Sequence, residues 1–409
     1  MKCNKWTLAL AAAGVVSLGS VAQAEEAQHQ VLTALSSTTL SGYVDTSAIW
    51  KPGTDVGGGR LPGHVFDGAD RMDGFNLHAV KLTLEKPLDE GQWAAGYKAD
   101  FVAGPDANYY STSLNGGGIN NGDFAIKQAY VALRAPVGNG IDFKVGVFDT
   151  IIGYEVFESG NNPNFSRSYG YSLEPTQHTG LLASYHVTDW LSIAGGVADT
   201  SYGAINSRAT INGAPAAESR KSYMGSITLS LPESAGPVAG SVIYLGYIAG
   251  LNGVNVGGTE NTTSAYAGAT FKTPVTGLSV GAAFDYRTDF PTQATGIPPA
   301  ALVENKAYAV AGYVTYALTE KLRINDRVDY ANADSGTFYA HPENGVDANG
   351  GPEQLLSNTL TLDYSLWENV ITRGEFRWDH SLTGDHPYGG VDNPMQNAYI
   401  LAANIIYKF

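Results

Sequence analysis

The sequence predicts an all-β protein, a transmembrane antiparallel β-barrel of about 16 strands with short periplasmic turns and long extracellular loops. Three observations predict this fold. Apolar and polar residues alternate in the last strand, segments of about ten to thirteen residues recur along the chain, and the connections between them alternate in length. Strands of about 9–11 residues are long enough to cross a bilayer when tilted, so these segments fit a barrel wall.

The amino-terminal region is expected to be a cleaved export signal rather than part of the fold. Residues 1–24 combine Lys2 and Lys5 with an apolar stretch over 8–18 and an A-x-A site ending at Ala24. Cys3, the only cysteine, would leave with it, so the mature chain is expected to have no disulfide and no Cys-ligated metal. Residues 25–38 are then a short periplasmic lead, and residues 39–409 form one barrel domain in the bacterial outer membrane.

The composition also favours a barrel. Charged residues make up 15 % of the chain, and it contains 49 Gly and 24 Tyr. Low charge and many aromatic residues are typical of alternating strands with aromatic girdles. The net charge is −15, which becomes −17 once the two lysines of the signal are removed. This acidity excludes nucleic acid as a partner, because phosphate recognition needs a basic surface.

Strands are expected wherever period-2 alternation runs between turn residues. The clearest cases are residues 93–101, 141–147 and 278–287, in which an apolar row alternates with small or charged residues. The expected strands are 40–50, 75–86, 92–103, 123–135, 141–149, 178–187, 190–200, 222–231, 239–249, 262–272, 278–289, 305–318, 321–331, 355–366, 370–381 and 397–409.

The connections between these strands alternate between short and long. The short ones are 87–92, 136–140, 187–190, 232–237, 273–277, 319–321 and 367–369, and the long ones are 51–74, 104–122, 149–177, 200–221, 250–261, 290–304, 332–353 and 383–395. Short periplasmic turns and long outer loops are typical of bacterial outer-membrane barrels, and they place both termini on the periplasmic side. Fourteen or 18 strands would result if one hairpin were merged or split. A secreted soluble β-sandwich is the alternative, but it would need more charge on its outward faces.

The final strand indicates how the protein reaches its membrane. Tyr407 and Phe409 close an apolar row that faces one way along the strand, as expected on the lipid side of a barrel. We interpret these two residues as an assembly signal. The expected partners are the barrel-assembly machinery, through this C-terminal strand, and outer-membrane lipid and lipopolysaccharide.

The inward faces of three expected strands carry alternating charges. They comprise Arg287, Arg323, Arg327, Asp329, Arg373, Glu375, Arg377 and Asp379. Residues i and i+2 share a face, so these side chains form an ion ladder on one wall of the lumen. The ladder either braces the strands or supplies the basic half of a transverse field across a pore. Asp326 does not fit the pattern, because it would face lipid, which predicts a bulge near Arg327.

The connection over 149–177 is unusually apolar for a loop. It contains Ile, Val, Phe, Tyr and Leu side chains that indicate packing against another part of the protein. Its charged residues are Glu155, Glu158, Arg167 and Glu174. By analogy with the third loop of general porins, we hypothesise that Glu155 and Glu158 face Arg327, Arg373 and Arg377 and form a constriction. The alternative is that these acids lie in solvent at the outer mouth.

Several segments resemble the bacterial outer-membrane β-barrel porins described as OmpL-like. They are Ser41-Gly-Tyr-Val-Asp-Thr-Ser47, Lys81-Leu-Thr-Leu-Glu-Lys-Pro-Leu-Asp89, Gly146-Val-Phe-Asp149, Gly153-Tyr-Glu-Val156, the stretch 162–180, and Arg373-Gly-Glu-Phe-Arg-Trp-Asp-His-Ser381. The resemblance covers nearly the whole mature chain, and its most specific part is 162–180. It implies an outer-membrane barrel with a pore function, and it supplies no catalytic residues.

The expected function is therefore a water-filled channel for passive diffusion of ions and small hydrophilic solutes, without a cofactor. A homotrimer is possible. The main alternative is a structural or interaction barrel with an occluded lumen, whose long loops bind a partner. A hydrolase is a third possibility, because Ser184 and His186 share a strand face, but an i, i+2 pair arises easily by chance. No His or Cys spacing fits a metal site.

Overall fold

The computed structural model describes residues 37–52, 73–110, 124–201, 205–208, 210–211, 214–215, 220–251, 261–288, 306–334, 337–338, 353–384, 386–388 and 395–409. The expected signal peptide and nearly all of the expected lead, up to residue 36, lie outside these described residues. Within them, no helix has the length and hydropathy of a membrane-spanning helix.

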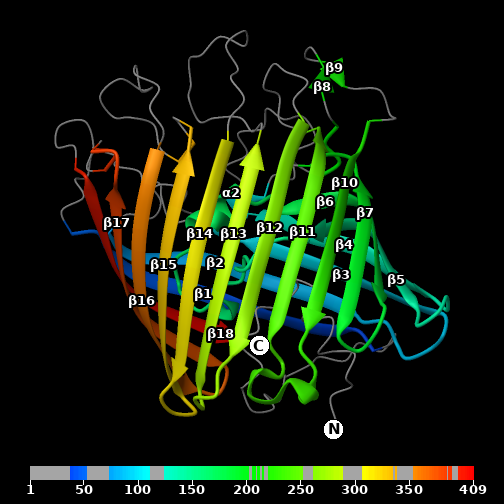
Figure 1. The fold of residues 1–409 in the computed structure, drawn as a ribbon, viewed down its shortest axis with the longest axis horizontal. Coiled ribbons are helices and arrows are strands. Elements are labelled where there is room, and N and C mark those ends of the chain that lie inside the picture. The colour runs from blue at the N-terminus through cyan, green and yellow to red at the C-terminus, as the bar shows by residue number, and fades with distance from the viewer. Residues whose placement is uncertain are drawn as a thin grey trace.

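The described residues form a closed antiparallel barrel of 16 strands (Figure 1). Each strand pairs with its sequence neighbours in the wall, and β1 pairs with β18 to close the ring. The strands of the wall are β1 (Thr39–Trp50), β2 (Gly74–Lys86), β3 (Ala94–Ala103), β4 (Phe124–Ala135), β5 (Ile141–Asp149), β6 (Gln177–His186), β7 (Leu191–Ala198), β10 (Ser222–Ser230), β11 (Val242–Leu251), β12 (Asn261–Lys272), β13 (Leu278–Thr288), β14 (Lys306–Ala317), β15 (Leu322–Ala333), β16 (Glu353–Trp367), β17 (Val370–Ser381) and β18 (Asn397–Lys408).

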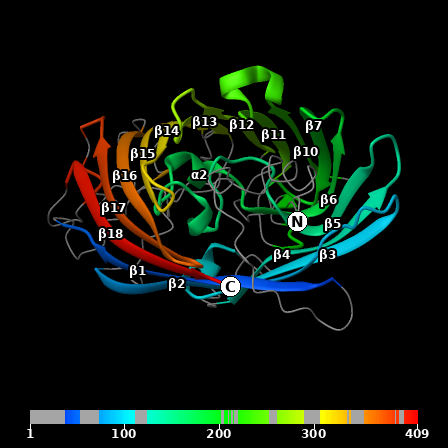
Figure 2. The ribbon, with the colours of Figure 1, turned by 90° about the horizontal axis from the view of Figure 1, so that it is seen from below.

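The remaining elements lie in the connections. Short strands β8 (Thr210–Ile211) and β9 (Ala214–Pro215) pair with each other outside the wall. The helical turns are η4 (Pro105–Tyr109), η5 (Ser159–Asn161), α2 (Tyr169–Leu173) and η6 (Glu233–Val238). Figure 2, viewed along the barrel from below, shows α2 inside the ring of strands rather than at its rim.

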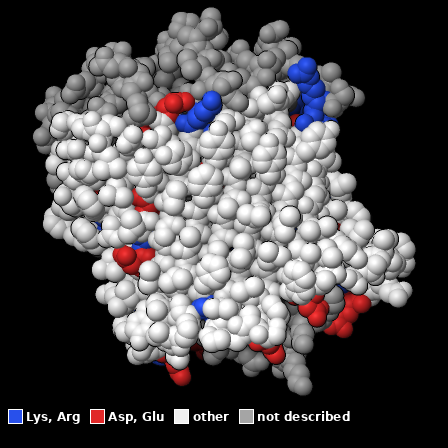
Figure 3. All heavy atoms as spheres, in the orientation of Figure 1, with Lys and Arg blue, Asp and Glu red and all other residues white. Residues whose placement is uncertain are grey.

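The alternation predicted from the sequence separates the two faces of the wall. In β18, Leu401, Ile405 and Tyr407 are 37 %, 52 % and 48 % exposed, whereas the intervening Ile400 and Ile406 are buried. An exposed apolar row is stable only when lipid replaces water around it. Figure 3 shows that the face presented in the view of Figure 1 is mostly uncharged across its middle, with many of its charged residues near the upper and lower margins. This outer face is suited to the hydrocarbon layer of a membrane.

The barrel closes where the two ends of its wall meet. Gly42 and Phe409 exchange two backbone hydrogen bonds, of 2.8 and 3.0 Å, which extend the β1–β18 pairing to the last residue. Gly42 also has no room for a side chain, because an added Cβ would lie 2.2 Å from the Lys81 carbonyl oxygen. The last residue of the chain is therefore part of the closed wall.

The fold prediction is confirmed. The 16 expected strands coincide with those of the wall, and the largest boundary difference is at β11, which begins at Val242 rather than at 239. The predicted bulge near Arg327 is wrong, because β15 pairs with β14 and β16 without a register shift. Asp326 therefore lies on the outward face, and its carboxylate accepts a hydrogen bond of 3.0 Å from the Asn358 amide beside it. A neighbouring polar side chain thus partly replaces water for this carboxylate.

A real register shift occurs between β3 and β4. Asp100 pairs with Gln128 and Phe101 pairs with Ile126, so Lys127 is the extra residue of a bulge. Lys127 and Gln128 are consecutive and yet both are buried, because the bulge turns both side chains inward. This bulge turns Lys127 into the barrel, where it contacts Glu158 of the connection between β5 and β6.

Candidate functional site

The connection between β5 and β6, residues 150–176, lies inside the barrel, and we call it the inner segment. It contains η5 and α2, and Figure 2 shows it within the ring. Its apolar residues Ile151, Phe157, Phe165, Tyr169 and Leu173 are all buried. The apolar composition noted in the sequence is thus explained by packing against the inward faces of the wall.

The wall makes room for α2 by carrying small residues on its inward face. Tyr169 and Leu173, four residues apart on one side of the helix, pack in a cluster with alanines and a leucine of β14, β15 and β16. The cluster contains Ala307, Ala309, Ala331, Ala333 and Leu355. Ser168 caps the helix by accepting a hydrogen bond of 3.3 Å from the Tyr171 amide.

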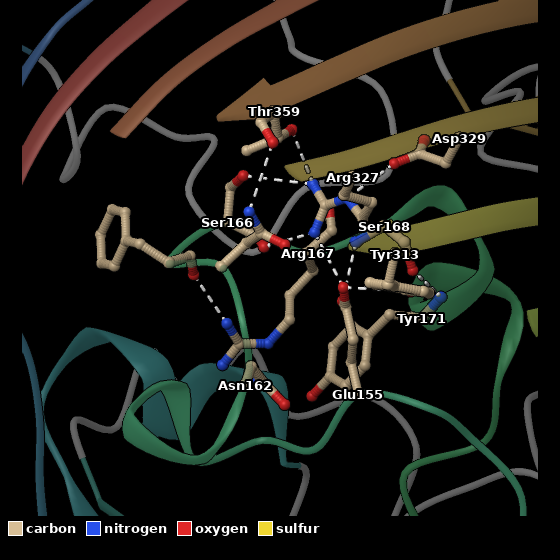
Figure 4. A network of polar contacts seen from close by, with 12 residues as sticks. Glu155, Asn162, Ser166, Arg167, Ser168, Tyr171, Tyr313, Arg327, Asp329 and Thr359 are labelled. Atoms are coloured by element: carbon tan, nitrogen blue, oxygen red, sulfur yellow. Dashed lines mark hydrogen bonds and ion pairs between the residues drawn. The ribbon is translucent and has the colours of Figure 1, made fainter. Parts of the chain in front are cut away.

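Arg327 of β15 is fully buried and is the centre of a polar network (Figure 4). Its guanidinium donates to Glu155 Oε1 at 2.8 Å, to the Ser166 carbonyl at 2.7 Å and to the Arg167 carbonyl at 3.1 Å. Its Nε lies 2.8 Å from Asp329 Oδ2 on the same strand. One wall residue therefore binds two parts of the inner segment at once.

Arg377 and Arg373 of β17 make the same kind of contact. Arg377 donates to the Arg167 carbonyl at 2.5 Å and to its strand neighbour Asp379 at 2.7 Å. Arg373 donates to the carbonyls of Ser159 at 2.8 Å and Asn162 at 3.2 Å. We call Arg327, Arg373 and Arg377 the arginine wall. A planar guanidinium has several fixed donors, which suits it to hold backbone carbonyls in one geometry.

The carboxylates of the ladder bind donors of the inner segment. Glu375 accepts hydrogen bonds from the backbone amides of Phe165 at 2.6 Å and Ser166 at 2.9 Å. Asp379 accepts one of 2.6 Å from the Tyr169 hydroxyl. The ladder predicted from the sequence therefore exists, and its basic and acidic members both contact the inner segment.

Glu155 lies where the sequence hypothesis placed it. Besides Arg327, its carboxylate accepts hydrogen bonds from the Ser168 amide at 2.8 Å and the Tyr313 hydroxyl at 3.2 Å. Glu158 does not face the arginine wall, and this part of the hypothesis is wrong. Its carboxylate contacts Lys81 at 2.5 Å and Lys127 at 3.2 Å, because η5 turns it toward β2 and β4.

The electrostatic surroundings of Glu158 stabilise its charged form. Burial alone would raise the pKa of Glu158, but the ammonium groups of Lys127 and Lys81 outweigh burial and hold the pKa well below its usual range. Glu158 is therefore ionised over the physiological pH range. It joins the inner segment to the side of the barrel formed by β2 and β4.

Glu174 follows α2 and has the opposite character. Burial raises the pKa of Glu174 well above its usual range, and the neighbouring Asp285 carboxyl raises it further. The two carboxyl groups share a side-chain hydrogen bond. Glycines make room for them, because a Cβ on Gly153 would lie 2.3 Å from the Glu174 carboxylate and a Cβ on Gly170 would lie 2.2 Å from Asp285. Arg287, on β13 with Asp285, donates to the Leu173 carbonyl at 3.0 Å.

Arg167 and Arg323, the two remaining residues predicted to line the pore, lie in different surroundings. Arg167 folds back onto the inner segment and donates to the carbonyls of Phe165 at 2.7 Å and Phe157 at 2.6 Å. Arg323 lies near the turn end of β15, 3.4 Å from Asp363, with its side chain 21 % exposed. Arg167 therefore stabilises the segment internally, and Arg323 belongs to the ladder at its more exposed end.

A second basic wall faces the inner segment and was not predicted from the sequence, where only the carboxyl-terminal arginines were assigned to the lumen. Lys81, Lys98, Lys127 and Lys144 lie on the inward faces of β2, β3, β4 and β5, and we call them the lysine wall. Three of them pair with carboxylates: Lys81 lies 3.2 Å from Asp100, Lys98 lies 3.6 Å from Glu85, and Lys127 contacts Asp149 and Glu158. Lys81, Lys98 and Lys144, in the inward phase of three strands, were the signal available in the sequence, whereas Lys127 turns inward only through the bulge.

Two cavities border the inner segment on this side. The larger, which we call the turn-side cavity, has a volume of about 730 Å³ and is lined by β2–β7, β10 and the short turns, reaching Asp149, Thr150 and Ile151. The smaller, of about 40 Å³, also touches Asp149 and Thr150 and lies among Lys127, Glu158 and Glu174. Both of these cavities therefore lie beside the lysine wall, whereas the inner segment covers the arginine wall.

Other chemistry finds little support in the geometry. Among the described residues, no three or more His, Cys, Asp or Glu side chains are grouped so as to hold a metal ion. The ring of His186 contacts Ser192 at 2.8 Å, in the neighbouring strand. Ser184 and His186 both border the turn-side cavity.

A closed 16-strand wall, an apolar outer belt and a long connection folded into the lumen define a porin-like outer-membrane barrel. Residues 37–409 match the family described as "Putative beta-barrel porin-2, OmpL-like", and the chain belongs to this family. The resemblance noted in the sequence is thus confirmed. The proteins of this family are typically channels rather than enzymes.

Solved structures share the fold at low sequence identity. The outer-membrane channel DcaP of Acinetobacter baumannii aligns with a TM-score of 0.58 and 12 % identity, covering 91 % of this chain and 97 % of that one. OmpF of Salmonella typhi, in complex with daunomycin, aligns with a TM-score of 0.57 and 12 % identity, covering 91 % of this chain and 97 % of that one. The anion-selective porin of Comamonas acidovorans aligns with a TM-score of 0.52 and 14 % identity, covering 91 % of this chain and 99 % of that one. Among curated proteins, none matches the chain in sequence.

Proposed function

We propose that the protein is a diffusion channel for ions and small hydrophilic solutes, narrowed by the inner segment. The observation that carries this proposal is the position of the segment, held inside a closed barrel with the turn-side cavity beside it. A 16-strand barrel is wide enough to leave an aqueous channel, and a segment fixed inside it reduces the passage to one side.

The geometry supports a fixed constriction rather than a mobile lid. The arginine wall holds the segment at Ser159, Asn162, Ser166 and Arg167. On the other side Glu158 binds Lys81 and Lys127. Charge-assisted hydrogen bonds that are shielded from water are stronger than exposed ones, so the segment is expected to keep one position during conduction.

The narrowest part of the path is proposed to lie near the ion pair of Lys127 and Asp149. Asp149 and Thr150 border both cavities, so a solute leaving the turn-side cavity meets this pair first. The smaller cavity, of about 40 Å³, is far smaller than the turn-side cavity of about 730 Å³. The channel should therefore have a low conductance and should exclude large solutes.

A second candidate is a barrel with an occluded lumen that binds a partner through its long loops. It is favoured by the contacts of the inner segment with both walls and by the small volume of the second cavity. The two functions differ in one measurable property, which is whether ions cross the barrel.

The partners proposed from the sequence agree with a channel of this class. OmpT of Vibrio cholerae, which shares the fold at 12 % identity and a TM-score of 0.53, has been described in a trimer form. We propose that this protein likewise forms homotrimers in outer-membrane lipid with lipopolysaccharide. We also propose that Tyr407 and Phe409 present the C-terminal strand to the barrel-assembly machinery.

Single-channel recording of the protein purified from outer membranes and inserted in a planar bilayer tests the function. We expect discrete, ohmic steps that are smaller than those of an unobstructed 16-strand barrel. A heat-modifiable, folded barrel that conducts no current would refute the channel and would establish the occluded barrel instead. Exclusion of uncharged polymers of increasing size then measures the width of the constriction.

A further inference from the structure

We propose that Lys144 makes the turn-side cavity a binding site for small oxyanions, such as carboxylates and inorganic phosphate. The inference rests on the proposed function, because it concerns what the channel admits. Two lysines that border this cavity, Lys144 and Lys86, have no ion pair among the described residues, and Lys144 is the one on an inward face of the wall.

Lys86, at the turn end of β2, also borders the cavity without an ion pair among the described residues, but three other basic side chains near it have carboxylate partners. Arg134 donates to both oxygens of Asp142, at 2.6 and 2.7 Å. Lys127 contacts Asp149, and Lys98 lies 3.6 Å from Glu85. Bidentate and shielded pairs of this kind leave little net charge for a solute to bind.

Lys144 differs from these residues. Among the residues that the structure describes, no carboxylate oxygen lies within 4.0 Å of the Lys144 ammonium, the limit for an ion pair. Its ammonium lies 5.0 Å from the centre of the Tyr130 ring instead. A ring face attracts a cation but carries no net charge, so the positive charge of Lys144 remains uncompensated.

The strand pairing fixes the direction of this side chain. Lys144 pairs with Ala132 of β4 and with Leu182 of β6, whose side chains share its inward face. Lys144, Ala132 and Leu182 all border the cavity. Lys144 therefore lies beside the apolar side chains of Ala132 and Leu182 at the edge of a space of about 730 Å³, which is in the range of small-molecule sites.

An ammonium that is partly removed from water and has no anion is under-solvated, so an entering anion is favoured over a cation. The hydroxyl-bearing Ser184 also borders the cavity and can complete an oxyanion site as a donor. Asp89 and Glu90 are opposing charges, but they lie in the exposed turn after β2, where water and salt screen them.

Reversal potentials in a salt gradient test the inference with the protein purified from outer membranes. Lys144→Gln removes the charge, Lys144→Arg retains it, and Lys321→Gln makes the same charge change in an exposed turn. We expect Lys144→Gln to lower the ratio of anion to cation permeability by about fivefold, the effect of a unit charge about 4 Å away in water. Lys144→Arg and Lys321→Gln should leave the ratio unchanged.

Two further outcomes separate the failure of the site from the failure of the channel. If the wild-type protein conducts and Lys144→Gln has the same selectivity, the anion site is refuted and the channel stands. If the protein conducts no current, equilibrium binding of inorganic phosphate to the detergent-solubilised barrel decides. Phosphate binding that is lost in Lys144→Gln supports the site without the channel, and no binding to the wild type overturns both.

Discussion

The arginine wall and the lysine wall lie in the same lumen but bind the inner segment differently. Arg327, Arg373 and Arg377 each direct guanidinium donors at backbone carbonyls of the inner segment, which cannot change their charge or move independently of it. The lysines bind carboxylates as point charges, and Lys144 has none among the described residues. The comparison indicates that arginine supplies the rigid attachment, and in the proposed channel the lysine wall is the side that a solute would meet.

The position of the turn-side cavity separates the two walls further, although Lys127 is buried as Arg327 and Arg377 are. Arg327 and Arg377 are fully buried, and the inner segment lies directly against them. The turn-side cavity, by contrast, borders Lys144 and reaches the segment only at its first residues. A charge that is completely enclosed by partners contributes to position, whereas a charge beside free space contributes to selectivity.

The largest effect is expected from Arg327→Ala. The substitution leaves Glu155 and Asp329 buried without their cation and removes two hydrogen bonds to segment carbonyls. Removing one partner of a buried ion pair typically costs about 3–5 kcal/mol. We expect this loss in the free energy of unfolding, measured by urea denaturation in detergent, together with a several-fold increase and greater noise in single-channel conductance.

Arg327→Lys is the matched comparison for that substitution. It keeps the charge near Glu155 but cannot reach Ser166 and Arg167 with separate fixed donors. We expect a partial loss of stability. If Arg327→Lys and Arg327→Ala both behaved as the wild type, the arginine wall would not be what holds the segment.

The wall of the barrel could be predicted from the sequence because period-2 alternation is a local property. Each strand exposes one face to lipid, and a shift by one residue would reverse it, so the pattern specifies the register. Asp326 is the instructive exception. Its outward position was interpreted as a bulge, but the neighbouring Asn358 supplies a hydrogen bond that alternation alone does not reveal.

The site was predictable only in part, because it depends on contacts between residues far apart in the sequence. Arg327, Arg373 and Arg377 could be assigned to one wall, and Glu155 could be placed near them. Glu158, three residues after Glu155, could not be placed correctly. The turn η5 begins there and directs its carboxylate toward β2. Lys127 was hidden by the bulge in β4, which breaks the alternation at that position.

An intermediate effect is expected from the carboxyl pair of Glu174 and Asp285. The pKa of Glu174 is raised in the folded protein, so its contribution to stability is fully present below the ordinary carboxyl value of roughly 4.3. This contribution is lost as the pH rises through the folded pKa, because the ionised carboxylates repel each other. The attachment of α2 to β13 should therefore weaken from acid toward neutral pH.

Glu174→Gln tests this dependence, since the amide remains neutral at every pH. The wild type should lose at least about 1.4 kcal/mol of unfolding free energy between acid and neutral pH, the equivalent of one pKa unit. The variant should lose less over the same interval, and its current noise should not increase with pH. Equal pH profiles for the two proteins would exclude Glu174 as the titrating group.

The smallest effect is expected from Arg323→Ala, which removes a member of the same ladder as Arg327. Arg323 lies 3.4 Å from Asp363 with a side chain that is 21 % exposed, and Asp363 keeps a second partner in Arg373 at 3.2 Å. A pair of this kind contributes about 0–1 kcal/mol. We expect an unchanged conductance and a loss of unfolding free energy within that range. A loss as large as that of Arg327→Ala would show that the whole ladder braces the barrel, and that contact with the inner segment is not what distinguishes its members.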